Sequence, residues 1–136
     1  MGYVYADIIL KNTKDVLDVK RGYLPEEDIR QVTVHAMVDT GAGTLIINES
    51  VRQKLGLEVA GERPVSLADN TAKKCIFTEP VEIHWQNRYT TLRPIVLPDA
   101  EEVLLGAIPL EDMDLIVHPL QGTLVGAHGD TQVCRV

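Results

Sequence analysis

The sequence lacks most of the features that mark a secreted, metal-binding or membrane protein. Its 136 residues include two cysteines, Cys75 and Cys134, neither with a histidine at metal-ligand spacing. This usage predicts two free thiols in a reducing compartment. No apolar run approaches the length that crosses a bilayer, and the first residues lack the basic start and cleavage site of a signal peptide. We therefore expect a cytoplasmic protein without a membrane partner.

Several classes of chemistry also lack their usual residues. The net charge is −7 and lysines and arginines form no run, which argues against nucleic acid as a partner. No glycine-rich phosphate loop is present, and no serine or cysteine stands in a nucleophile-elbow context. The histidines share no ligand spacing, so we expect neither a metal nor another cofactor. They are His35, His84, His118 and His128.

What the sequence does contain is alternation of apolar and polar residues over short stretches. Apolar residues make up 45% of the chain, enough for a packed core in a single domain spanning residues 1–136. Val32, Val34, Ala36 and Val38 fall on one face of a half-buried strand. Strands are expected at residues 3–10, 32–38, 65–67, 75–77, 81–85, 89–97, 115–117 and 123–125. Asp69-Asn70, a pair that tolerates positive φ, is expected to join residues 65–67 and 75–77 as a β-hairpin. The pattern predicts a mostly β fold with a closed, barrel-like sheet.

Helix is scarce in this pattern. Asn48 can cap a short helix that runs to Leu55 and ends at Gly56. Residues 107–113 form a second candidate, in which Pro109 is tolerated in the first turn. The polar segment from Lys11 to Pro25 is expected to form a loop or an edge excursion. We therefore expect one or two short helices.

The most informative segment spans Val34 to Ile47 and reads VHAMVDTGAGTLII. An apolar strand ends in one carboxylate, Asp39, and the chain turns at Gly41. An Asp-Thr-Gly tripeptide alone is weak, because an aspartate in a hairpin turn often bonds its own backbone. Apolar residues on both sides favour a functional carboxylate instead. One carboxylate is half of a water-activating pair, and no second Asp-Thr-Gly occurs, so we expect the other half from a second copy of the chain.

A second motif, Val-Leu-Leu-Gly at residues 103–106, is an apolar strand that ends in glycine before a short helix. Together the two motifs resemble those of retropepsin-type aspartic proteases, the single-domain family of retroviral proteases and their bacterial relatives. Residues 39–42 match the family's Asp-Thr-Gly-Ala, and residues 104–106 match its apolar-apolar-Gly. Two departures stand out. Ala107 and Ile108 follow where viral members often carry Arg and then Asn or Asp, and the expected hairpin lacks their glycine-rich tip.

The resemblance assigns a role to each matching residue. It implies that Asp39 is the catalytic group and that the hydroxyl of Thr40 links the two catalytic loops across the two-fold axis. It also implies that Gly41 lets the substrate backbone approach closely. Ala42, Leu105 and Gly106 would support the catalytic loop. Ala68, Asp69 and Asn70 fall where the family places its substrate-covering flap. The implied protein is a homodimeric aspartic endopeptidase that acts on peptides or proteins without a cofactor.

Three alternatives stand beside this interpretation. The chain could be a non-catalytic retropepsin-like module for dimerisation or peptide binding, or an ordinary β-domain with a coincidental turn. A two-carboxylate glycosidase is the third. We expect its candidate acids to lie instead on a solvated loop and a helix surface. These acids are Glu101, Glu102, Glu111, Asp112 and Asp114.

Overall fold

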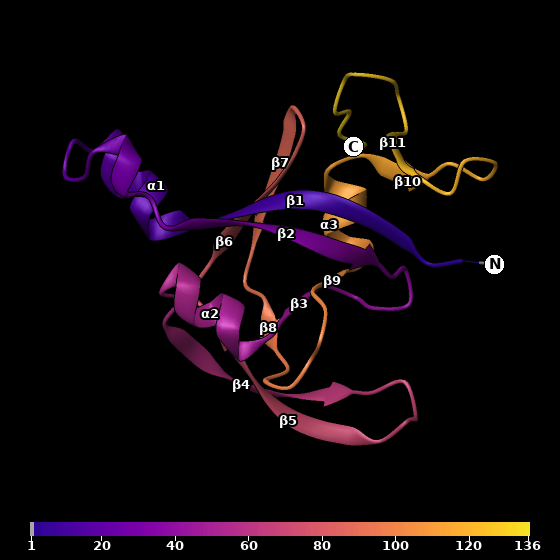
Figure 1. Ribbon diagram of the computed structural model, residues 1–136, viewed down its shortest axis with the longest axis horizontal. Coiled ribbons are helices and arrows are strands. Elements are labelled where there is room, and N and C mark those ends of the chain that lie inside the picture. Colours follow the sequence, from indigo (N-terminus) through magenta and orange to yellow (C-terminus); the bar gives the residue numbers. More distant parts are fainter. Residues whose placement is uncertain (1) are drawn as a thin grey trace.

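The computed structural model describes residues 2–136 and consists mainly of strands (Figure 1). The strands are β1 (Val4–Asn12), β2 (Gln31–Val38), β3 (Leu45–Ile47), β4 (Val59–Ser66), β5 (Ala72–Thr78), β6 (Val81–Trp85), β7 (Arg88–Leu92), β8 (Ile95–Val96), β9 (Leu104–Leu105), β10 (Leu115–Val117) and β11 (Leu124–Gly126). The helices are α1 (Thr13–Lys20), the short 3-10 helix η1 (Glu26–Asp28), α2 (Glu49–Leu55) and α3 (Ala107–Asp112). The expectation of a mostly β protein is confirmed.

Nine strands form one sheet in the order β4-β5-β8-β3-β9-β2-β1-β6-β7, and β10 pairs with β11 separately. The sheet curls into a half-barrel. Its hydrogen-bonded order ends at β4 on one side and β7 on the other, so the strands do not close the barrel. Short β9 lies between β2 and β3, parallel to the first and antiparallel to the second.

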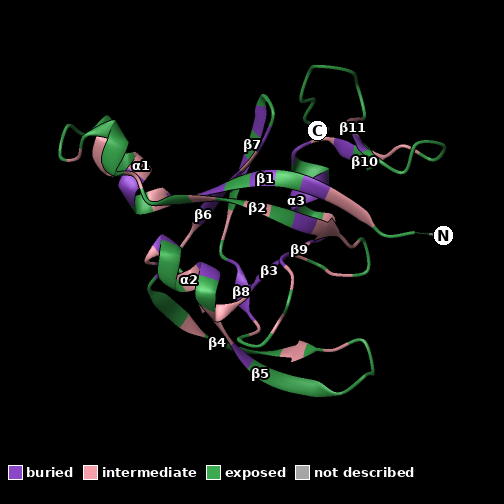
Figure 2. Ribbon diagram, viewed as in Figure 1, coloured by how far each residue is buried: buried purple, intermediate pink, exposed green. Residues whose placement is uncertain are grey.

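The core follows the alternation seen in the sequence. Strands β1 and β2 pair antiparallel, with Ile8 opposite Val34 and Ala6 opposite Ala36. Ala36 and Ile8 are buried in the main apolar cluster, against which Val32, Val34 and Val38 also pack. The expected face of β2 is therefore confirmed. Figure 2 shows buried positions alternating with exposed ones in β1, whereas in β2 exposed positions alternate with intermediate ones.

Two helices form where the sequence predicts them. Helix α2 is capped by Asn48, whose side chain accepts a hydrogen bond from the backbone N–H of Val51 at 2.9 Å. It ends at Gly56, which has the left-handed φ of 60° that glycine adopts without strain. Helix α3 spans residues 107–112 and contains Pro109 in its first turn, as expected. Both predictions are confirmed.

The expectation of a loop over residues 11–25 is wrong. Strand β1 continues to Asn12, and helix α1 follows directly. Asn12 caps this helix by accepting a hydrogen bond from the N–H of Asp15. Buried Asp15 in turn accepts bonds from the backbone and guanidinium of Arg30 at 2.8–2.9 Å. A helix anchored by polar contacts shows little apolar periodicity, so the sequence pattern does not predict α1. The structure has three α-helices within residues 2–136, whereas one or two were expected.

The segment expected as one strand over residues 89–97 is also divided. It forms the outer strand β7 and the central strand β8, separated by Arg93 and Pro94. Pro94 has no N–H to donate to a ladder, but its carbonyl accepts a bond from Thr78 at 3.1 Å. The remaining expected strands form. The hairpin of β4 and β5 and the pair β10–β11 are confirmed.

Candidate active site

Asp39 stands directly after β2, at the point where three strands meet. Its backbone N–H donates to the carbonyl of Leu105 at 3.0 Å, which extends the parallel pairing of β2 with β9 by one residue. Leu105 is fully buried, and its other neighbour across the sheet is Leu45 in β3. The position of Asp39 is thus set by its neighbours β2 and β3 together with β9, which lies far from it in the sequence.

The Asp39 carboxylate is bonded to the turn that follows it. The Oδ1 atom of Asp39 accepts a hydrogen bond from the backbone N–H of Gly41 at 3.0 Å. The backbone carbonyl of Asp39 accepts another from the N–H of Ala42 at 3.0 Å. A Cβ at Gly41 would lie 3.2 Å from that same Oδ1, a tight contact. The side chain of Asp39 is half-buried, whereas Thr40 and Gly41 are exposed. The loop therefore presents a fixed carboxylate at the surface of this chain.

Gly106 locks the same loop from the other side. A Cβ at Gly106 would lie 2.6 Å from the carbonyl oxygen of Ala42 and even closer to that of Thr44. These contacts leave no room for any side chain. The next two residues, which begin helix α3, donate backbone bonds to the carbonyls of Ala42 (2.8 Å) and Gly43 (3.1 Å). The structure brings the Asp-Thr-Gly loop and the Leu-Leu-Gly motif together.

The candidate carboxylate lies on the face of the sheet opposite the main core. Met37 pairs with Leu104, whereas Val38 pairs with the core residue Leu105. Because side chains alternate along a strand, Asp39 follows Met37 onto the same face as Leu104. Leu104 packs in a second apolar cluster, centred on Ile46, Cys75 and Ile95.

The second cluster also contains residues from β4 and β5, the hairpin that carries the proposed flap. Val65 and Phe77 of this hairpin are half-buried against it. Apolar side chains from the hairpin and from the strands beside Asp39 therefore line one continuous face. Buried Cys75 belongs to this cluster and is a free thiol, as the sequence predicts.

The tip of the hairpin is a tight turn made by its own residues. Ala68, Asp69 and Asn70 are exposed, and Asn70 has a left-handed φ of 65°. The Asp69 carboxylate accepts bonds from the N–H (3.0 Å) and hydroxyl (2.6 Å) of Thr71, which hold the pKa of Asp69 below its usual value. In Figure 1 this turn and the loop after β2 extend toward the same side of the molecule.

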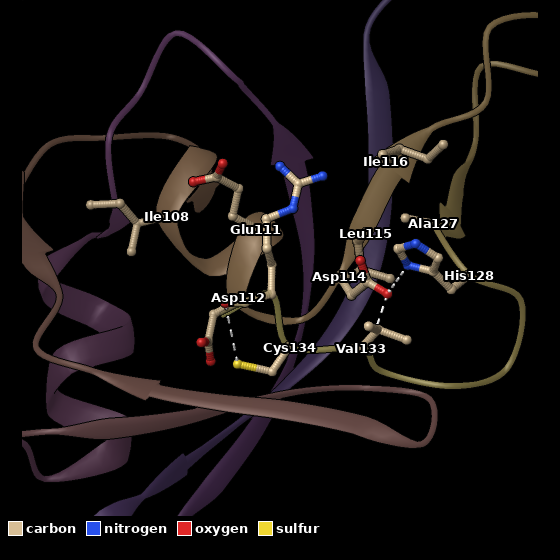
Figure 3. Close-up of a pocket in the computed structure, with 11 residues that line it drawn as sticks. Ile108, Glu111, Asp112, Asp114, Leu115, Ile116, Ala127, His128, Val133 and Cys134 are labelled. Atoms are coloured by element: carbon tan, nitrogen blue, oxygen red, sulfur yellow. Dashed lines mark hydrogen bonds and ion pairs between the residues drawn. The ribbon is translucent and has the colours of Figure 1, made fainter.

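A hollow of about 760 Å³ lies between α3 and the C-terminal residues (Figure 3). Asp114 is hydrogen-bonded to His128 at 2.7 Å and accepts a bond from the N–H of Val133 at 3.1 Å. The bond from His128 lowers the pKa of Asp114. Asp39 does not line this hollow, but Ile108 does, and its N–H donates to the carbonyl of Gly43 in the Asp39 loop.

Sequence reasoning misplaced Asp114 and missed Arg88. The expectation of a solvated surface is wrong for Asp114, whose side chain is 12% exposed. Arg88 is 2% exposed and donates to the carbonyls of Met113, Asp114 and Gly129, which ties β7 to the C-terminal segment. An alternating strand pattern does not reveal a buried arginine, because arginine normally marks the exposed face.

The histidines are bonded to protein groups. His35 pairs with Asp7 and His84 with Glu82, both at 2.7 Å. Among the described residues, no group of three or more His, Cys, Asp or Glu side chains could hold a metal ion. Within residues 2–136, no helix is long and apolar enough to cross a membrane.

The curled sheet, with its Asp-Thr-Gly loop held by a Leu-Leu-Gly strand, is the arrangement of a retropepsin-like aspartic protease. A model of the gag-polyprotein putative aspartyl protease family matches residues 27–112, more than half of the chain. The chain belongs to this retropepsin-like family. The match includes the Asp39 loop, the hairpin and all of α3.

Solved structures were also compared with the chain. The retroviral protease-like domain of Ddi1 from Leishmania major is similar with a TM-score of 0.57 and 16% identity, covering 92% of this chain and 88% of that one. A retropepsin-like aspartic protease from Rickettsia conorii has a TM-score of 0.48 and 24% identity, covering 64% and 69%. No curated protein sequence matches. The likeness to the Leishmania domain shows the fold.

Proposed function

We propose that this protein is an aspartic endopeptidase that works as a homodimer, with residues 1–136 forming its single domain. Each subunit contributes one Asp39, and the two carboxylates face each other across a two-fold axis. The substrates are peptides or proteins, and no cofactor takes part. The observation that carries the proposal is Asp39 itself, which the strands β2, β9 and β3 hold at the surface of a family member.

Amide hydrolysis explains why two carboxylates are needed. Two carboxyl groups about 3 Å apart cannot both ionise, so the pair shares one proton. The ionised group takes a proton from the attacking water, while the protonated group donates a hydrogen bond to the scissile carbonyl. Such a pair titrates as one unit with two macroscopic steps. A single Asp39 supplies one of these roles, which is why the proposal requires a second copy.

The surroundings of Asp39 support this assembly. Thr40 and Gly41 are exposed in the single chain, so a partner's loop can reach them. The Thr40 hydroxyl is proposed to bond across the axis, and Gly41 to let the substrate backbone approach. Ala42, Leu105 and Gly106 hold the loop from behind through the contacts described above.

The hairpin with Ala68, Asp69 and Asn70 at its tip is proposed to cover an extended peptide. A peptide bound under a hairpin forms backbone hydrogen bonds as an added strand, and its alternate side chains enter pockets. Opening and closing of such a hairpin commonly gates turnover. The expected cytoplasmic location stays a prediction.

The test is the substitution Asp39→Asn in the full chain. We expect cleavage of a complex peptide mixture, followed by mass spectrometry between about pH 4 and pH 8, to fall by about a thousandfold or more. Amide and carboxyl groups have nearly the same shape, so folding and dimerisation should persist, as judged by circular dichroism and light scattering.

Asp28→Asn is the matched control, because Asp28 is an exposed aspartate in η1. It precedes the start of β2, whereas Asp39 follows the end of that strand. It should leave cleavage unchanged. The proposal is overturned if the wild-type protein cleaves no peptide, if Asp39→Asn retains turnover, or if the active species is a monomer. A dimer that binds peptides without cutting them would indicate the non-catalytic module instead.

A further inference from the structure

The register of the β4–β5 hairpin places two cations on one of its faces. Arg63 lies opposite Cys75, and Val65 lies opposite Lys73. Residues directly opposite each other in an antiparallel pair point to the same side. Arg63 and Lys73 therefore share a face with Val65 and Cys75.

This face is the one turned toward the side of the sheet that carries Asp39. Val65, Cys75 and Phe77 pack in the second apolar cluster with Leu104 and Ile46. Leu104 in turn pairs with Met37, two residues before the catalytic carboxylate and on its face. The hairpin thus contributes apolar and positively charged groups to the same surface as Asp39.

The two cations differ from their neighbours in having no carboxylate partner among residues 2–136. The Arg63 guanidinium stacks on the Phe77 ring, 4.4 Å from its centroid, and Lys73 is exposed. On the opposite face of the hairpin, Lys74 is paired with Glu62 at 3.6 Å. The charges of Glu62 and Lys74 therefore cancel on their face, which we call the outer face. The inner face, which carries Arg63 and Lys73, stays positive.

The acid at the hairpin's tip keeps its charge, but within residues 2–136 it forms no ion pair with Arg63 or Lys73. The Asp69 carboxylate is already bonded to the N–H and hydroxyl of Thr71 within the turn. The protein as a whole carries a net charge of −7. Arg63 and Lys73 thus form a local positive patch on an acidic protein. Its electric field acts on a peptide bound under the hairpin.

We propose that the inner face of the β4–β5 hairpin selects substrates with an acidic side chain close to the scissile bond, through Arg63 and Lys73. This inference rests on the proposed function. Along an extended peptide, side chains alternate between two sides, so apolar residues can pack on the second cluster while the neighbouring acid faces the hairpin. The chemical class of substrate is a peptide with mixed apolar and acidic residues.

The test starts from a peptide that the wild-type protein cleaves, found by mass spectrometry in a complex peptide mixture. At each position within about four residues of the cut, Glu, Gln and Lys versions are synthesised and compared by kcat/KM at low ionic strength. We expect Glu to exceed Gln, and Gln to exceed Lys, by about two- to fivefold at one position or more. The preference should shrink as salt is added.

Lys73→Glu should reverse this order at the same position, and Lys74→Glu is the control with the identical charge change on the outer face. The control should keep the wild-type order. Wild-type cleavage without an acid preference overturns the inference and leaves the proposed function standing, as does an equal response of Lys73→Glu and Lys74→Glu. Absence of any cleavage by the wild-type protein overturns the proposed function and this inference with it.

Discussion

The Asp39 loop and the β4–β5 hairpin are built by opposite means. The loop is held from outside, because β9 inserts beside it and the backbones of Asp39, Ala42 and Gly43 each bond to residues 105–108. The hairpin is held mostly by itself, since β4 is the edge of the sheet and its turn is closed by bonds among residues 67–71. Elements with few external contacts open at low free-energy cost. The comparison separates a fixed carboxylate, the proposed catalytic group, from a hairpin that can move, the proposed cover.

Gly106→Ala is the strongest way to break this comparison. The added Cβ would meet the backbone oxygens of Ala42 and Thr44, neither of which can move without disrupting β9 or the loop. We expect the free energy of unfolding to fall by about 3 kcal/mol, as for severe overpacking. Urea unfolding followed by circular dichroism measures this change.

Gly43→Ala is the matched control in the same loop, because a Cβ there meets nothing within 4 Å. It should change the free energy of unfolding by less than about 0.5 kcal/mol. Similar losses for the two variants would show that the loop is sensitive to any substitution, and the inserted strand would then not be what fixes Asp39.

The contrast between elements fixed by local bonds and elements fixed by distant residues explains what could be predicted from the sequence. The Asp39 strand, the capped helix α2 and the tight turn at Asp69-Asn70 have local signals: alternation, an Asn cap with a terminal glycine, and a residue pair that tolerates left-handed backbone. Their elements appear where expected. The Leu-Leu-Gly motif was recognised through resemblance, since two residues of strand carry almost no local pattern.

The features that were missed depend on contacts between distant residues. Helix α1 is fixed by Asp15 binding Arg30, and the C-terminal segment by buried Arg88. Both involve charged residues, which a sequence pattern assigns to the surface. The division of residues 89–97 into two strands falls at Arg93 and Pro94, where the proline has no N–H for a ladder. The Asp15–Arg30 and Arg88 contacts could not be derived from local propensity, because they join residues distant in the sequence.

Asn70→Ala should have a smaller effect and sharpens the comparison on the hairpin side. Asn70 has a φ of 65°, a conformation that costs alanine about 1 kcal/mol. We expect a loss of that size in the free energy of unfolding, about a third of the Gly106→Ala effect. Asn70→Gly is the control and should match the wild type or exceed it. Equal stability of the alanine and glycine variants would contradict a left-handed backbone at this position.

The pH dependence of the hairpin turn is the finest test. Because Thr71 donates two bonds to the Asp69 carboxylate, the pKa of Asp69 is lowered from 3.8 on folding. A lowered pKa stabilises the turn at pH values above 3.8, and that stabilisation is lost as the pH falls through the lowered value. We expect the NMR amide shift of Thr71 to titrate below pH 3.8. Asp69→Asn, which keeps an acceptor oxygen but cannot ionise, should abolish the titration. A wild-type Thr71 shift that stays constant while other carboxylates titrate would show that Asp69 does not close the turn.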